Sequence, residues 1–174
     1  LKLPKDIGLL SLDIDGIDYW VWEKIETIKP IIFICEYNAV FGDLNSLTIP
    51  YIKNFNRYKY HHSNLAFGAS IKAFQKLATK KGYILLGTNS NGVNAYFIRK
   101  EYYNELKKKI RNIKKFSSKF RESRDKNYKK NFLRGIERKK KIEDVELINL
   151  DKKKEIIKLK NIKKIYSSNW NYNS

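Results

Sequence analysis

The feature that most constrains the fold is a strand-helix-strand pattern near the start of the sequence. Leu9 to Ile14 and Ile31 to Glu36 are short apolar runs, which are typical of buried β-strands. Between them, Asp18 is placed to cap a helix from Tyr19 to about Ile28, which Lys29-Pro30 ends. A strand-helix-strand connection of this length joins neighbouring parallel strands. The pattern therefore predicts an α/β fold with a parallel sheet.

A second helix and a hairpin follow. The helix begins after Gly68 and ends at Gly82, and its apolar face consists of Ile71, Phe74, Leu77 and Ala78. Tyr83 to Thr88 and Ala95 to Arg99 are predicted strands, and the turn NSNGVN between them makes an antiparallel hairpin. Three strands are therefore expected to run in one direction, with only Ala95 to Arg99 running against them.

The remaining segments are less regular. Residues 38 to 67 show no periodicity, and a loop of that length inside a compact domain is usually functional. Residues 1 to 100 are predicted to form the α/β unit. Residues 101 to 174 are predicted to form a basic α+β tail: a lysine-rich helix over residues 102 to 116, a polar irregular segment FRESRDKNYKK, and a small hairpin in VELINLDKKKEIIKLK.

The composition limits the cellular compartments and the binding partners that are expected for this protein. The formal net charge is +19, and most of it lies after residue 100. Two explanations are open: the lysine-rich composition that AT-rich coding DNA gives, or a surface that binds polyanions such as nucleic acid. The only cysteine, Cys35, cannot form an internal disulfide, which suits a cytoplasmic protein. No apolar run reaches the length of a membrane span.

Polar side chains are expected to gather at the carboxyl ends of the strands, where open α/β sheets bind ligands. They are Asp13, Asp15, Glu36, Asn38, His61, His62, Asn89 and Asn94. Asp13 and Asp15 would share one face of a strand, and two such charges require a metal, a shared proton or a cationic ligand. The structural alternative is a strand end in which one aspartate caps the helix and the other is solvated.

Several chemistries fit these residues. Asp13, Asp15, Glu36 and Asn38 offer the hard oxygen ligands that a divalent cation takes, as a minority possibility, and His61 could act as a general base. The segment LDIDGI also resembles the DxDG motif of haloacid-dehalogenase-type phosphatases, with Asp13 as nucleophile and Asp15 as acid/base. That chemistry also needs a lysine and a second acidic cluster at a strand end, which the sequence does not supply.

A longer resemblance runs from Leu9 to about Leu159. The segments LLSLDIDGIDYWVWEKI, IIFICEYNAVFG, FGASIKAFQKLATKKGYILLGTNSNGVNAYFIRK and FRESRD together resemble the carboxyl-terminal portion of FkbM-like methyltransferases, in a branch with DIDGxDYW and EYN. The resemblance implies a Rossmann-like class I methyltransferase sheet, in which Leu9 to Ile14 is the fourth strand and Ile31 to Glu36 the fifth. The hairpin would supply the sixth strand and the antiparallel seventh.

The same resemblance implies an S-adenosylmethionine-dependent O-methyltransferase that acts on a sugar or another small hydroxylated acceptor. Asp13 and Asp15 would border the cofactor sulfonium and the acceptor, as both catalytic and cofactor-binding residues, with His61 as the third catalytic candidate. The acceptor cleft would be lined by Glu36, Asn38, His62, Asn89 and Asn94.

One departure from the family is severe. Such enzymes hold S-adenosylmethionine on a glycine-rich loop after their first strand and an acidic residue after the second, and this chain contains neither. The chain is therefore expected to be a fragment of a longer enzyme and to be inactive alone. The strand Leu9 to Ile14 would then have one open edge, which favours self-association. The alternative outside enzymology is a polyanion-binding module built on the basic tail.

Overall fold

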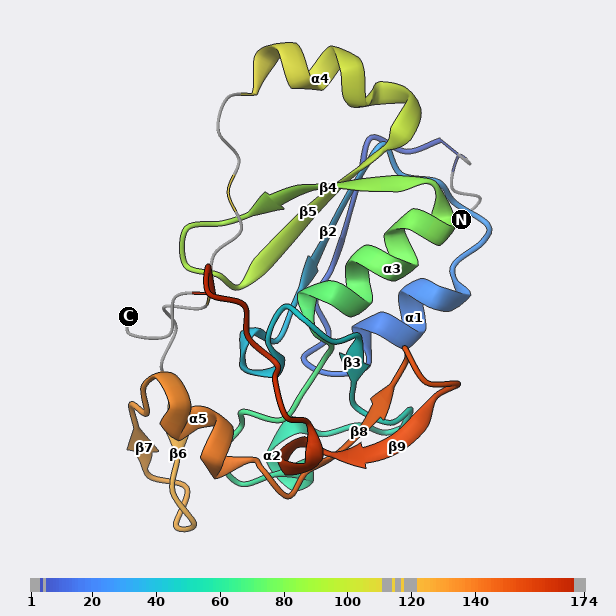
Figure 1. Ribbon diagram of the computed structural model, residues 1–174. Helices are drawn as coiled ribbons and strands as arrows, with labels where there is room; N and C mark the ends of the chain where they lie inside the picture. Colours follow the sequence, from blue (N-terminus) through green and yellow to red (C-terminus); the bar gives the residue numbers. More distant parts are fainter. Residues whose placement is uncertain (1–3, 5, 111–113, 115–116, 118–121, 171–174) are drawn as a thin grey trace.

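The computed structural model describes residues 4, 6–110, 114, 117 and 122–170. Its main element is a four-stranded mixed sheet with two helices on one face (Figure 1). The elements are β1 (Leu9–Leu12), α1 (Asp18–Lys24), β2 (Ile32–Glu36), α3 (Ile71–Lys81), β4 (Tyr83–Thr88) and β5 (Asn94–Arg99). The predicted α/β class is thus confirmed.

The strand order in this sheet is β1-β2-β5-β4. β1 and β2 pair in parallel, whereas β5 lies antiparallel to both β2 and β4. β1, β2 and β4 consequently run in one direction and only β5 runs against them, as the sequence predicted. β1 and β2 are the one parallel pair of neighbours in this sheet.

The core of the sheet is aromatic and lies between the strands and the two helices. Trp22 of α1 stacks on Phe33 of β2 with ring centroids 3.9 Å apart, and Phe97 of β5 packs beside both. The prediction of a helix to Ile28 was wrong, because α1 ends at Lys24. Its buried apolar side chains are Tyr19 and Trp22, so aromatic residues supply the core face of this helix.

Among the described residues β1 pairs with β2 alone, so it forms an edge of the main sheet. This open edge was predicted, but the prediction of a buried strand was wrong: the Leu9 side chain is 52% exposed. The strand also ends at Leu12, before the two aspartates. Asp13 and Asp15 therefore belong to the turn after β1 and not to the strand itself.

The region predicted as a loop contains β3 (Leu47–Thr48), the one-turn α2 (Arg57–Tyr60) and a 3-10 turn (Ala39–Phe41). β3 pairs with β8 (Glu146–Asn149), which pairs with β9 (Glu155–Lys158). The predicted tail hairpin is thus confirmed, and it continues into a sheet with the loop. A second apolar core forms there from Phe41, Leu47, Ile49, Ile142, Leu147 and Leu159.

The rest of the tail is mostly short elements. The predicted lysine-rich helix is α4 (Tyr103–Lys109), and residues 111–113, 115 and 116 of that prediction lie outside the described residues. The polar segment was predicted to be irregular, yet its described part contains β6 (Ser123–Arg124), which pairs with β7 (Lys130–Asn131). α5 (Gly135–Lys141) was not predicted.

Within the described ranges, no helix has the length and apolar character to cross a membrane.

Candidate functional site

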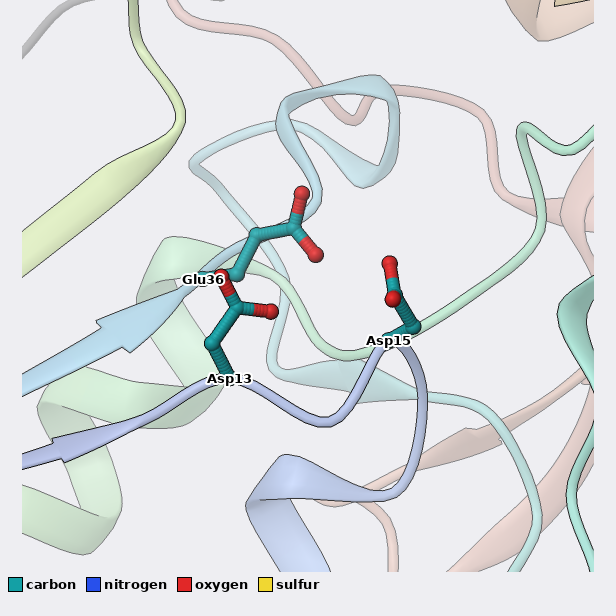
Figure 2. A group of neighbouring side chains, drawn as sticks. All are labelled: Asp13, Asp15 and Glu36. Carbon is teal, nitrogen blue, oxygen red and sulfur yellow. The ribbon is translucent and has the colours of Figure 1, made fainter.

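Three of the predicted acidic residues meet at the carboxyl ends of β1 and β2. Asp13 follows β1, Asp15 lies in the next turn, and Glu36 is the last residue of β2. Each offers a carboxylate oxygen, and these oxygens lie within 4.8 Å of one another. Figure 2 shows the three carboxyl groups gathered around one space. We call Asp13, Asp15 and Glu36 the acidic triad.

Asp18 holds the turn that carries the triad. Its buried carboxylate accepts hydrogen bonds from the backbone N–H groups of Ile14, at 3.1 Å, and Gly16, at 2.9 Å. The prediction that Asp18 caps the helix was wrong, since Ile17 occupies the N-cap position. Asp18 instead stabilises a turn in which Asp15 adopts a left-handed backbone conformation, with φ of 56°.

Gly16 allows the long loop to approach this turn. A Cβ atom at position 16 would collide with the ring of Phe55, and the N–H of Gly68 donates to the carbonyl of Gly16 at 2.9 Å. The loop is thereby held against the strand ends.

Glu36 has a pKa well above the ordinary value of a glutamate. Burial raises its pKa, Arg57 lowers it, and the charges of the neighbouring aspartates raise it again, to about 7. Its Oε2 atom is buried and accepts no hydrogen bond from any described residue. A carboxyl group with such a pKa exchanges a proton readily near neutral pH, which makes Glu36 a candidate general base.

Arg57 is the site residue that the sequence analysis missed. It lies on α2, and its Nη1 donates to Asp15 Oδ1 at 3.0 Å. Its Nε donates to the carbonyl of Asn64 at 2.7 Å, and its guanidinium lies 3.6 Å from the ring centroid of Phe67. The available signal was a lone arginine after Asn56, which caps α2, within an aromatic loop.

A cavity of about 260 Å³ opens beside Asp15, the one member of the triad that lines it, while Glu36 lines a smaller cavity of about 30 Å³. The larger cavity is lined by Ile14, Asp15, Phe55, Asn56, Arg57, Tyr58, Asn64 and Glu122. Its walls therefore come from the turn after β1, from the long loop and, through Glu122, from the tail. The volume suits a small molecule or part of one.

Asn38 lines a small cavity of about 30 Å³ together with Glu36, but its polar atoms are not free to bind a metal or an acceptor. Its Oδ1 accepts from the N–H of Val40 at 2.9 Å, and its Nδ2 donates to the carbonyls of Leu65, at 2.8 Å, and Phe67, at 2.9 Å. The side chain is buried and both its polar atoms are occupied within the protein. Asn38 holds the two ends of the long loop together. Of the four residues predicted as ligands of a cation, only the three of the triad remain candidates.

The histidines lie at a different cavity. His61, with Tyr60, Lys140 and Lys141, lines a space of about 420 Å³ that includes no member of the triad. The Nδ1 atom of His61 lies 2.7 Å from Ser63 Oγ. Burial, followed by the charges of His62 and Lys141, lowers the pKa of His61 to about 4. A histidine that holds its proton so weakly is a poor base at neutral pH, so the structure does not support His61 as the catalytic base.

His62 packs against His61 with ring centroids 4.4 Å apart. Burial is also the main cause that lowers the pKa of His62, and its buried Nε2 has no hydrogen-bond partner among the described residues. It lines neither of the cavities that Asp15 and Glu36 line, nor the one beside His61. The predicted acceptor-cleft role of His62 therefore finds no support in the geometry.

The two asparagines of the hairpin have different positions. Asn89 Oδ1 accepts from the N–H groups of Val93, at 2.8 Å, and Asn94, at 3.1 Å, so this side chain holds the turn together. Asn94 lies directly opposite Glu36 in the ladder between β2 and β5. Only Asn94 is thus placed next to the triad.

Comparison of the chain with models of protein families, with curated proteins and with solved structures found no match.

Proposed function

We propose that this chain is the carboxyl-terminal part of an S-adenosylmethionine-dependent methyltransferase that methylates a hydroxyl group of a sugar or another small acceptor. The observation that carries the proposal is the acidic triad beside a small cavity, with Glu36 poised to exchange a proton near pH 7. Such a carboxyl group suits the removal of a proton from a hydroxyl group as that group is methylated.

The sheet supports the proposal without depending on the site. The resemblance required three strands in one direction, a last strand against them, and an open edge on the first strand. β1, β2, β4 and β5 have those directions, and β1 lies at the edge. Many α/β proteins share such features. The fold is therefore compatible with the proposal, and the evidence for this particular function must come from the site.

The chemistry assigned to this chain is acceptor binding and proton removal. S-adenosylmethionine, when bound, supplies an electrophilic methyl group on a sulfonium cation. Asp13 and Asp15 provide negative charge near the cavity, which favours a cationic neighbour even though the chain as a whole is strongly basic. The walls of the cavity beside Asp15 orient the acceptor, and Glu36, whose carboxylate lies within 4.8 Å of that of Asp15, accepts the hydroxyl proton.

The chain does not contain a complete cofactor pocket. The glycine-rich strand-to-helix loop that the family uses has no counterpart among these 174 residues, and the acidic triad matches only the positive charge of the cofactor. No step is therefore assigned to cofactor-binding residues within this chain.

The experiment that tests the proposal uses the full-length gene product that contains this chain. It is incubated with isotope-labelled S-adenosylmethionine and a panel of sugars and small hydroxylated acceptors, and mass spectrometry detects methylated products. We expect labelled methyl transfer to at least one acceptor.

Two parallel assays test the rivals. Phosphatase activity towards an aryl phosphate in the presence of Mg²⁺, without methyl transfer, would favour the DxDG interpretation. Salt-sensitive binding to unrelated DNA sequences, again without methyl transfer, would favour a polyanion-binding module.

A further inference from the structure

The acidic triad needs a nearby positive charge. Three carboxyl groups whose oxygens lie within 4.8 Å of one another repel when ionised. From the sequence, a metal ion, a shared proton or a cationic ligand was expected to relieve this repulsion. The structure instead places a side chain of this chain against the triad, because the Arg57 guanidinium forms an ion pair with Asp15 at 3.0 Å.

Arg57 is held in place by contacts that do not depend on the triad. The Asn64 carbonyl accepts its Nε–H, and its guanidinium lies on the face of Phe67. Phe67 is in turn fixed, because its carbonyl accepts a hydrogen bond from Asn38 Nδ2. The Arg57 side chain is only 16% exposed, whereas that of Asp15 is 71% exposed. The arginine is thus the anchored partner and the aspartate the one that is positioned.

We propose that Arg57 is the positioning residue of this site: its guanidinium fixes the Asp15 carboxylate and supplies the positive charge that a divalent cation would otherwise supply to the acidic triad. This charge balance is present before any ligand binds, and it does not depend on whether the protein transfers methyl groups. It assigns a role to the long loop, since α2 delivers Arg57 from that loop to the ends of β1 and β2.

The ionisation of Glu36 agrees with this role. Among the charged groups that act on Glu36, Arg57 is the one that lowers its pKa, while Asp13, Asp15 and Asp18 raise it. The charge of Arg57 therefore acts on Glu36 as well as on Asp15, the carboxylate that it contacts. A partly buried guanidinium is screened less by solvent than a surface charge, which strengthens this effect.

The test measures how tightly Mn²⁺ alone binds to the full 174-residue chain, followed by water-proton relaxation. Arg57→Gln removes the positive charge, so Mn²⁺ is expected to bind about tenfold tighter, because the loss of one nearby like charge changes the binding constant by about that factor. Arg57→Lys keeps the charge and is expected to return the affinity most of the way to that of the unsubstituted chain.

Arg99→Gln is the matched control. Arg99 is a buried arginine that pairs with Asp6 and Glu101 at the opposite end of β5, so its loss should leave Mn²⁺ affinity unchanged. A folded Arg57→Gln variant whose Mn²⁺ affinity equals that of the unsubstituted chain would overturn the proposal.

A second measurement keeps the proposal testable if Arg57→Gln fails to fold. Asp15→Asn alters an exposed side chain and should fold. A fixed ion pair slows rotation of the guanidinium, so the Arg57 Nη1 proton signals should be visible by NMR in the unsubstituted chain and broaden in Asp15→Asn. Signals that are equally broad in both proteins would show that Asp15 and Arg57 do not hold each other.

Discussion

The Glu36→Gln variant is expected to be more stable than the unsubstituted chain above pH 7, and no more stable below about pH 4. In the folded chain the pKa of Glu36 is raised to about 7 from an ordinary value of 4.5. The stability linked to protonated Glu36 is therefore fully present below pH 4.5 and is lost as the pH rises through 7. Glutamine stays neutral and avoids that loss, which such a shift places at about 3 kcal/mol.

Urea unfolding between pH 4 and pH 9 measures this difference. Glu105→Gln, at an exposed position on α4, is the control and should follow the unsubstituted chain at every pH. If the curves for Glu36→Gln and the unsubstituted chain run parallel over the whole range, the carboxyl group is ordinary and its assignment as a general base fails.

The second large effect is expected on activity, in the full-length gene product. Asp13→Asn and Asp15→Asn each remove a charge while keeping the volume of an exposed side chain, so the melting temperature should stay equal or rise. The rate of methyl transfer should nevertheless fall about a hundredfold, because a carboxylate that orients a reacting group commonly contributes at least that much. Full activity in both variants would mean that the turn after β1 is only structural.

Asp18→Asn should show the opposite pattern and so serves as the control. The sequence suggested a helix cap that asparagine would replace, but both backbone N–H groups of the turn bond to the Asp18 carboxylate. Asparagine has one acceptor oxygen and leaves one buried N–H without a partner, at about 1–3 kcal/mol. We therefore expect lower stability together with activity that survives at temperatures where the variant is folded.

Elements that are specified by local sequence could be predicted well. α3 begins after Ser70, whose hydroxyl accepts from the Ala73 N–H, and ends at Gly82 in a left-handed conformation. The hairpin strand Tyr83 to Thr88 lies where the glycine that ends the helix and the following turn placed it. Signals of this kind depend only on neighbouring residues, so they remain valid whatever the rest of the chain does.

The site could be predicted only in part, because its details depend on residues far apart in the sequence. The triad followed from topology, since the carboxyl ends of parallel strands lie together. Asn38 was misjudged because its hydrogen bonds go to Leu65 and Phe67, which no spacing rule connects to it. Arg57 was missed for the same reason, as Asp15 lies 42 residues away along the chain.

The short span of β1 has a tertiary cause. The polar turn that follows is held by Asp18 and pressed by the long loop through Gly16, so the backbone leaves the sheet at Leu12. An apolar run alone indicates where a strand can form, whereas packing by the rest of the chain decides where it ends.

The central claim is that the acidic triad is the catalytic centre of a methyltransferase, with Glu36 as the base. The pH dependence of methyl transfer by the full-length gene product tests it most directly, measured as kcat/KM, which reports the pKa values of the free enzyme, for the unsubstituted enzyme and for Glu36→Gln. The account predicts a rate that rises with pH to a plateau, with its midpoint at the pKa of Glu36, about 7, and the loss of that step in Glu36→Gln. Methyl transfer that shows the same pH profile in both proteins, or no methyl transfer at all, would contradict the account.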